Sequence, residues 1–217
     1  MAYGASLLLR NAAIAMIAVT GSVFAEPVTV VALGDSLTAG YGLDQAEGFV
    51  PQMQAWLTAH GRDVVLINAG VSGDTTAGGL ARLDWSLTPD VGALIVNLGG
   101  NDLLRGLDPA ASRANLDAIL AAATARGLPV LLVGLRAPGN YGAGFKAAFD
   151  AIFPELAAKY GAVLEENYFL PLIDQKAAVL NPALMQADGI HPNAKGVAAA
   201  VAALGPKVLE VLDRVKR

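Results

Sequence analysis

Short runs of apolar residues alternate along the chain with longer segments in which apolar residues recur every three or four positions. The first pattern is typical of buried strands and the second of helices with one face against a core. The pattern predicts strands over residues 28–33, 64–69, 93–98, 129–134 and 162–165. It predicts helices over residues 49–60, 75–87, 109–126, 144–160 and 193–216.

Proline bears on three of these helices, because it has no backbone N–H to donate inside a helix. Pro109 suits the first turn of its helix, where no partner is needed. Pro154 is expected to kink or divide the helix over 144–160. Gly205 and Pro206 together are expected to break the last helix.

Strands that are apolar throughout, alternating with helices, indicate an α/β fold with a parallel sheet covered on both faces. The crossover connections are expected to be right-handed. In such open sheets, binding sites form outside the carboxyl ends of the strands. With 54% hydrophobic and 16% charged residues, the chain is rich enough in apolar side chains for one compact domain over residues 26–217.

The first 25 residues have a different character. Arg10 precedes an apolar run, residues 12–24, that ends in Val23-Phe24-Ala25. A basic flank, a short apolar stretch and a small residue before a break are typical of a secretory signal peptide. We expect residues 1–25 to be removed after Ala25 and the protein to be exported, periplasmic or secreted, with no membrane span once the signal is gone. An uncleaved N-terminal anchor is the alternative.

Composition excludes several kinds of site. The formal net charge is -4 and there is no cluster of Lys and Arg, which argues against a nucleic-acid partner. The chain has no cysteine, so disulfides and thiolate chemistry are excluded. Its two histidines have no acidic cluster near them in sequence, which argues against a metal site.

Four polar segments follow or flank the predicted elements: Gly34–Leu37, Ser72–Asp74, Gly99–Asp102 and Asp188–Pro192. The first three come after the first three strands. Since the carboxyl ends of parallel strands meet at one edge, these segments are expected to lie together there. Together they contain the groups that acyl transfer requires: a nucleophile, a base, a group that orients the base, and donors for an oxyanion.

Ser36, His191 and Asp188 are the candidate nucleophile, base and acid. Pro192 restricts the backbone beside His191, and Asp188 lies three residues earlier, close enough to turn back to Nδ1 of the ring. Nε2 would then be free to take the proton of Ser36, as in a serine triad. The alternatives are structural: Ser36 as a turn or helix N-cap residue, and Asp188 as a turn residue before the last helix. His60, before Gly61, suits the end of a helix at the surface.

Three groups are candidate donors to an oxyanion: the backbone N–H of Ser36, the backbone N–H of Gly73 and the side-chain amide of Asn101. Glycine at position 73 lets a ligand approach the backbone closely. The alternative is that the segments around Gly73 and Asn101 are ordinary turns into the following helices.

With its motifs in this order, the sequence resembles the SGNH (GDSL) hydrolase family, named after its Ser, Gly, Asn and His. The matching blocks begin at Gly34 (GDSLTAGYG), Gly73 (GDTTAGGLARL), Leu98 (LGGNDLLRG) and Asp188 (DGIHPN). The full sequence of these blocks, together with Asn140-Tyr141-Gly142, is similar to that of an exported bacterial branch of the family, which comprises acyl-CoA thioesterases, arylesterases and lysophospholipases.

The resemblance implies a three-layer α/β/α, flavodoxin-like fold around a five-stranded parallel sheet. It also implies a serine esterase that forms an acyl-enzyme, acts on small esters, thioesters or lysolipids, and needs no cofactor or metal. Asn140 and Tyr141 are implied as substrate-binding residues; from the residues alone they belong to a glycine-rich loop. A carbohydrate O-deacetylase, an acyltransferase or a binding module without chemistry are the alternatives on this scaffold, and nothing in the sequence indicates the oligomeric state.

Overall fold

The computed structural model describes Met1 and residues 26–216, so the predicted signal peptide lies almost wholly outside the described residues. A parallel sheet with strand order β2-β1-β3-β4-β5 forms the centre of the molecule. The predicted parallel sheet is therefore confirmed, strand by strand. Its members are β1 (Val28–Gly34), β2 (Val64–Gly70), β3 (Val91–Asn97), β4 (Val130–Val133) and β5 (Val163–Glu165).

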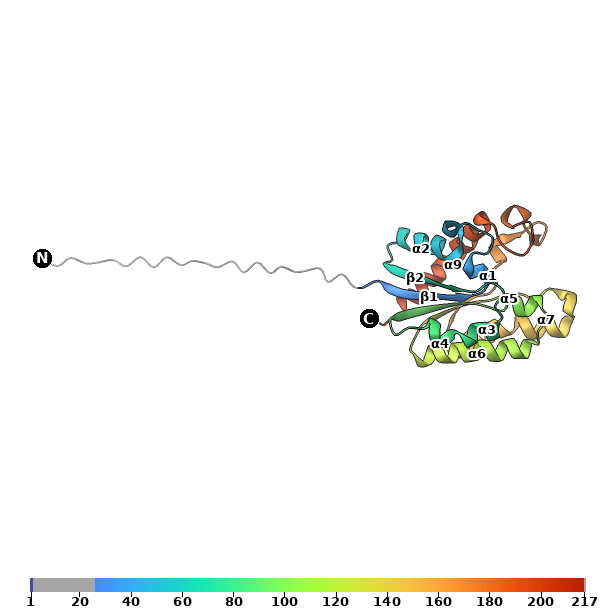
Figure 1. Cartoon of the computed structure of the whole chain (residues 1–217), viewed down its shortest axis with the longest axis horizontal. Coiled ribbons are helices and arrows are strands. Elements are labelled where there is room, and N and C mark those ends of the chain that lie inside the picture. The colour runs from blue at the N-terminus through green and yellow to red at the C-terminus, as the bar shows by residue number, and fades with distance from the viewer. Residues whose placement is uncertain (2–25, 217) are drawn as a thin grey trace.

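The register of the three longest strands decides where their loops lie. Gly34, the last residue of β1, pairs with Gly70 of β2 on one side and with Asn97 of β3 on the other. Since the three strands end level with one another, the segments that follow them leave the sheet side by side. Figure 1 shows the short helices α1 (Ser36–Ala39) and α5 (Gly100–Leu104) at this end of the sheet, away from both chain termini.

Helices cover both faces of the sheet and give three layers (Figure 1). One face carries α1 with α2 (Phe49–Ala59) and α9 (Ala194–Asp213), which pack on each other. The opposite face carries α3 (Thr76–Ala81), α4 (Leu83–Ser86), α6 (Pro109–Ala125), α7 (Ala143–Asp150) and α8 (Ile152–Tyr160). This is the expected three-layer α/β/α arrangement.

The core lies between the sheet and these two helix layers. Along β1, β3 and β4, consecutive side chains are buried, because each strand faces helices on both sides. The helices contribute a single apolar face each, as their sequence periodicity predicts; Phe49, Met53 and Leu57 of α2 are all almost completely buried.

The predicted helix over residues 75–87 is two short helices, α3 and α4, that meet at Arg82. Arg82 leaves helical geometry with φ −109° and ψ 6°. Its guanidinium donates to the backbone carbonyls of Gly34 and Ala69, at the ends of β1 and β2. These bonds to the sheet hold the side chain inward at the point where the helix divides.

The predicted helix over residues 144–160 is also divided, into α7 and α8, with Ala151 between them. Pro154 lies in the first turn of α8. Because it has no N–H, it cannot donate to the carbonyl of Asp150, and a helix start is the position where this loss matters least.

The prediction that Gly205 and Pro206 break the last helix is wrong, since α9 runs through both residues. The turns before and after Pro206 are anchored by buried side chains, including Val201 and Val208. Gly205 allows α9 to approach α2 closely, because a Cβ at this position would lie 2.6 Å from the ring of Trp56. Packing on both sides of the proline therefore outweighs the lost hydrogen bond.

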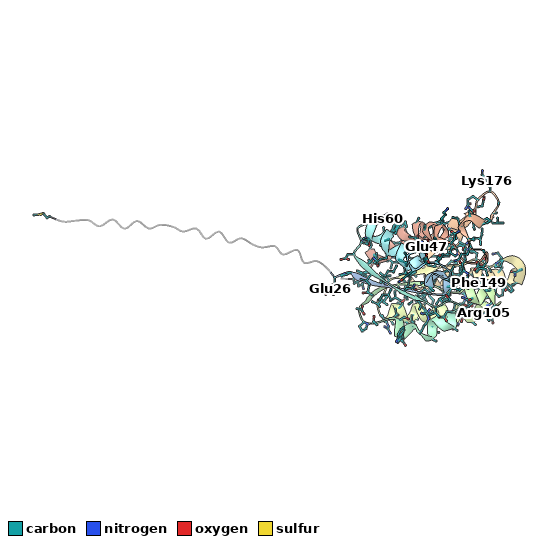
Figure 2. The ribbon with its side chains drawn as sticks, turned by 45° about the horizontal axis from the view of Figure 1, so that its top comes forward. Glu26, Glu47, His60, Arg105, Phe149 and Lys176 are labelled. Carbon is teal, nitrogen blue, oxygen red and sulfur yellow. The ribbon has the colours of Figure 1, made fainter. Side chains whose placement is uncertain are left out.

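An antiparallel hairpin, β6 (Ile173–Asp174) and β7 (Val179–Leu180), was not predicted from the sequence. Figure 2 shows Lys176 of its turn projecting from the domain at the end opposite Glu26. Arg105, which follows α5, lies at that same end (Figure 2). In residues 26–216, no helix is both long and apolar enough to cross a membrane.

Candidate active site

Ser36 is the first residue of α1, directly after the turn that leaves β1. Gly34 makes this turn possible, because a Cβ there would lie 2.1 Å from Oγ1 of Thr38. The carboxylate of Asp35 caps α1 by accepting a hydrogen bond from the N–H of Leu37 at 3.0 Å. Among the described residues, none accepts a hydrogen bond from the N–H of Ser36, which points out of the helix start.

Asp188 and His191 form the second part of the site, in the loop before α9. One carboxylate oxygen of Asp188 accepts from the N–H groups of Ile190 and His191, which closes the loop into a tight turn. The other lies 2.6 Å from Nδ1 of His191. These bonds, with the ring contact the strongest and the backbone N–H groups next, lower the pKa of Asp188 to about 2.

His191 connects this loop to Ser36. Its Nε2 lies 2.8 Å from Oγ of Ser36, across a sequence separation of 155 residues. An ionised carboxylate can only accept, so Nδ1 must carry the proton that faces Asp188. The lone pair of a neutral ring then lies on Nε2, facing the hydroxyl of Ser36. The structure thus brings the three predicted triad residues into one hydrogen-bonded chain.

Two residues that the sequence reasoning did not single out hold His191 against Ser36. The ring of Tyr41 packs on the imidazole with 4.6 Å between centroids. Nε2 of Gln186 donates to the carbonyls of Tyr41 and Pro192, and its backbone N–H donates to the carbonyl of His191. Gln186 therefore fastens the loop that carries His191 to the loop that follows Ser36. No local pattern marks such a bridging glutamine.

Asn101 lies on α5, after a turn in which Gly99 has the positive φ of 116°. Its Nδ2 lies 3.4 Å from Oδ2 of Asp35, so the segments after β1 and β3 are joined by a hydrogen bond. Asp35 itself is buried, and this burial raises the pKa of its carboxyl to about 6. In the sequence, Asp35 is marked only as a member of the polar segment Gly34–Leu37.

Gly73, the third candidate donor, follows β2 at the same edge and has a positive φ of 87°. Its carbonyl accepts from Nη2 of Arg105 at 2.8 Å, which ties it to the end of α5. In the described part of the chain, nothing accepts a hydrogen bond from its N–H. The neighbouring Asp74 is held by Nε of Arg82 at 2.6 Å, so this loop is fixed to the ends of β1 and β2.

A buried carboxylate also joins the loop of Gly73 to that of Asn101. Asp102 accepts from the N–H and the hydroxyl of Thr76, at the start of α3, and from the hydroxyl of Ser112 on α6. All three side chains are almost completely buried. Removing a partner would leave buried polar groups unsatisfied, so these bonds fix the relative position of α3, α5 and α6.

An elongated cleft of about 280 Å³ opens beside Ser36 and His191. Asn101, Asn140 and Tyr141 line it, while Gly73 and Asp188 lie outside its lining. Tyr141 is held by a hydrogen bond from its hydroxyl to the carbonyl of Leu104. The rest of the lining is mainly apolar and includes Leu37, Leu103, Leu104, Leu135, Pro138, Phe169, Leu180 and Ile190.

The second histidine lies elsewhere. His60 ends α2, its ring stacks on Trp56, and Figure 2 shows it on the opposite side of the domain from Arg105. Within the described residues, no group of three or more His, Asp or Glu side chains is arranged to hold a metal ion.

Comparison with known proteins finds similarity over most of this chain. The GDSL-like lipase/acylhydrolase family matches over residues 32–199. The Pseudomonas aeruginosa protein named Esterase TesA is 40% identical over 186 residues, which cover 85% of this chain and 89% of that protein. The Escherichia coli thioesterase 1/protease 1/lysophospholipase L1 is 38% identical over 167 residues, 76% of each chain. The crystal structure of AlinE4, described as an SGNH-hydrolase family esterase, aligns with a TM-score of 0.70 and 44% identity over 87% of this chain and 98% of that one.

The low pKa of Asp188 can be tested by NMR titration of its carboxyl carbon. The folded value, about 2, lies below the ordinary value of 3.8, so Asp188 stabilises the fold above pH 4 and this contribution is lost as the pH falls from about 4 to 2. In the variant His191→Ala the ring contact is gone and the backbone bonds remain, so the pKa should rise part of the way to 3.8. Asp90, whose pKa is lowered by its own neighbour Thr88, should not change. A value for Asp188 that is the same in both proteins would contradict the assignment.

Proposed function

The chain belongs to the GDSL-like lipase/acylhydrolase family and is a carboxylic ester hydrolase, and we propose that it works through Ser36, His191 and Asp188 with an acyl-enzyme intermediate. The observation that carries this proposal is the unbroken chain of contacts from Asp188 through both nitrogens of His191 to Oγ of Ser36. A hydroxyl is a weak nucleophile until a base removes its proton, and this arrangement supplies the base.

The reaction begins when Ser36 attacks the ester carbonyl and its proton passes to Nε2 of His191. The imidazolium that forms is stabilised by the carboxylate of Asp188, which also keeps the proton on Nδ1 and the ring in plane with Ser36. His191 then donates its new proton to the leaving alcohol or thiol. Water then attacks the acyl-enzyme while Nε2 of His191 takes its proton. His191 returns this proton to Oγ of Ser36 as the carboxylic acid leaves, and Ser36 is regenerated.

The negative charge on the carbonyl oxygen in both steps needs donors that are already in position. We propose that these are the N–H groups of Ser36 and Gly73 and the amide of Asn101. The free N–H groups of Ser36 and Gly73 and the apposition of Asn101 to Asp35 support this set. Their segments are fixed to each other through Arg82, Arg105 and Asp102, so little reorganisation is required when the charge forms.

The triad is tested by two substitutions that keep the size of the side chain. Ser36→Ala should reduce hydrolysis of an aryl ester to background, because it removes the hydroxyl that lies 2.8 Å from Nε2 of His191. Asp188→Asn should lower kcat roughly 10⁴-fold, because an amide in that position favours the wrong tautomer of the ring. Both are measured by steady-state release of p-nitrophenol, with thermal unfolding to verify the fold. Full activity of Ser36→Ala would eliminate the proposal, and labelling of the native protein but not this variant by a fluorophosphonate probe would support it.

We further propose that the substrates are esters and thioesters with an apolar acyl chain, lysophospholipids among them. The leucine-rich lining of the cleft supports this, since a carbohydrate ester would leave its hydroxyls without partners there. Besides His191, the acidic and basic side chains around the cleft are those of Asp35, which is almost completely buried, and Arg136, whose guanidinium pairs with Glu166 at the surface.

A series of p-nitrophenyl esters distinguishes this proposal from a carbohydrate deacetylase. Each methylene buried in the cleft should favour binding by about 0.8 kcal/mol, so kcat/KM should rise about fourfold for each methylene added from acetate to butyrate and hexanoate until the cleft is filled. A preference for acetate over every longer ester would overturn the assignment of acyl substrates while leaving the triad untouched. Transfer of the acyl group to a sugar alcohol in preference to water would indicate an acyltransferase.

We propose that residues 1–25 are a signal peptide and that residues 26–217 form the mature, exported hydrolase domain. The arginine, apolar run and Ala25 of the sequence support it. Expression of the full chain in a Gram-negative host, with fractionation and mass measurement, should give a protein beginning at Glu26 outside the cytoplasm. Recovery of the intact chain from the membrane fraction would instead indicate an uncleaved anchor.

A further inference from the structure

Asp35 is a buried carboxylate that the reaction just described does not use. It lies beside Ser36, yet it does not touch His191, and only 2% of its surface is exposed. Burying an ionised carboxylate is unfavourable unless pairing and hydrogen bonds offset the lost hydration, so its position here calls for an explanation. Capping α1 does not need the charge, because a neutral asparagine caps a helix as well as aspartate does.

The two oxygens of Asp35 have different partners. Oδ1 accepts from the N–H of Leu37, and Oδ2 faces Nδ2 of Asn101. Glycine at position 100 suits this approach, because a Cβ there would lie only 3.0 Å from Oδ2. The segment that carries Asn101 is therefore built to come close to the side chain of Asp35.

We propose that Asp35 is a positioning residue that fixes which end of the Asn101 amide faces the substrate. A carboxylate only accepts, so Asn101 must turn its NH₂ group toward it. One N–H then bonds Asp35 and the second is free for the oxyanion. A rotation of 180° about the last side-chain bond would place the carbonyl oxygen of Asn101 there instead, where it would repel the negative charge. This inference rests on the oxyanion role proposed for Asn101.

The substitution Asp35→Asn tests this because it leaves the helix cap in place. Oδ1 of the new asparagine is held by the N–H of Leu37, so its NH₂ group must face Asn101. Two NH₂ groups cannot bond each other, and Asn101 is expected to rotate and present its oxygen to the substrate. kcat should fall at least as far as on loss of one oxyanion donor, roughly 10²–10³-fold, with little change in KM.

A double-mutant cycle with Asn101→Ala separates positioning from a structural role. Once the amide is gone, Asp35→Asn should have no further effect on kcat. An equal loss in both backgrounds would overturn the inference, because it is what a carboxylate supporting the fold, or acting by charge on His191, would produce. Wild-type kcat for Asp35→Asn beside a reduced kcat for Asn101→Ala would also overturn it, and would leave the proposed function standing. Wild-type kcat for Asn101→Ala would contradict the proposed oxyanion role itself.

Stability gives an independent measurement. Burial raises the pKa of Asp35 to about 6, against the influence of Leu37, His191 and Asn101, and Asp102 adds to the rise. A raised value means that ionisation of Asp35 disfavours the folded state increasingly from pH 4 to 6 and by a constant amount above. At pH 8 the neutral variant Asp35→Asn should therefore unfold at the same or a higher temperature than the native protein. A lower Tm would mean that Asp35 supports the fold, and would overturn the inference.

The matched control is Asp108→Asn. Asp108 caps α6 through a hydrogen bond from the N–H of Ala110 at 2.9 Å, as Asp35 caps α1, and it lies outside the cleft. Both kcat and KM should stay within the error of the native values. A loss in this variant comparable with that of Asp35→Asn would overturn the inference, because it would show that any change of cap has this effect.

Discussion

Hydrogen bonds accepted by aspartate side chains hold the polar groups of this site in position, and the proposed chemistry depends on them. A carboxylate can accept up to about four hydrogen bonds, so one side chain can close its own turn and also bind a neighbouring segment. Asp35 does this for the loops after β1 and β3, and Asp102 for α3, α5 and α6. Asp188 closes its own turn and orients His191. The chain has no disulfide to do this, because it has no cysteine.

The sheet provides the frame on which these bonds act. β1 lies between β2 and β3, and the three end in register at Gly34, Gly70 and Asn97. Apolar side chains along β1 and β3 pack between the two helix layers and hold these strands in place. The apolar core thus decides that three loops emerge together, and the carboxylates decide how their polar groups face one another. The loop that carries Asp188 and His191 leads into α9, and Gln186 attaches it separately to the loop after Ser36.

The elements that the sequence predicted well are those whose signal is local. Five strands and their parallel arrangement follow from apolar runs alternating with helices. The candidate triad follows from a polar segment after the first strand, which holds Ser36, and from the segment before the last helix, which holds Asp188 and His191. The division of the helix over residues 144–160 was expected from Pro154, and the structure shows it. The division at Arg82 and the uninterrupted α9 could not be predicted, because they depend on contacts distant in sequence. Arg82 binds carbonyls of two strands, and Pro206 is tolerated because the turns on either side of it are buried. The bonds of Gln186 to Tyr41 and of Asp35 to Asn101 could not be predicted either, because these partners lie far apart in the sequence.

Two aspartates flank Ser36 and His191, and their environments shift their pKa values in opposite directions. Asp188 is partly exposed and accepts three hydrogen bonds, so its carboxylate is favoured and its pKa falls to about 2. Asp35 is buried, and its pKa rises to about 6, a shift from 3.8 that corresponds to roughly 3 kcal/mol against the charged form. The group that supports the imidazolium is therefore ionised at any moderate pH, whereas the group apposed to Asn101 is ionised only near neutrality and above. If Asp35 has the role proposed, the amide of Asn101 is held in one orientation only near neutral pH and above, where Asp35 is ionised. The free energy that the fold loses by burying this charge is then the cost of orienting that one amide.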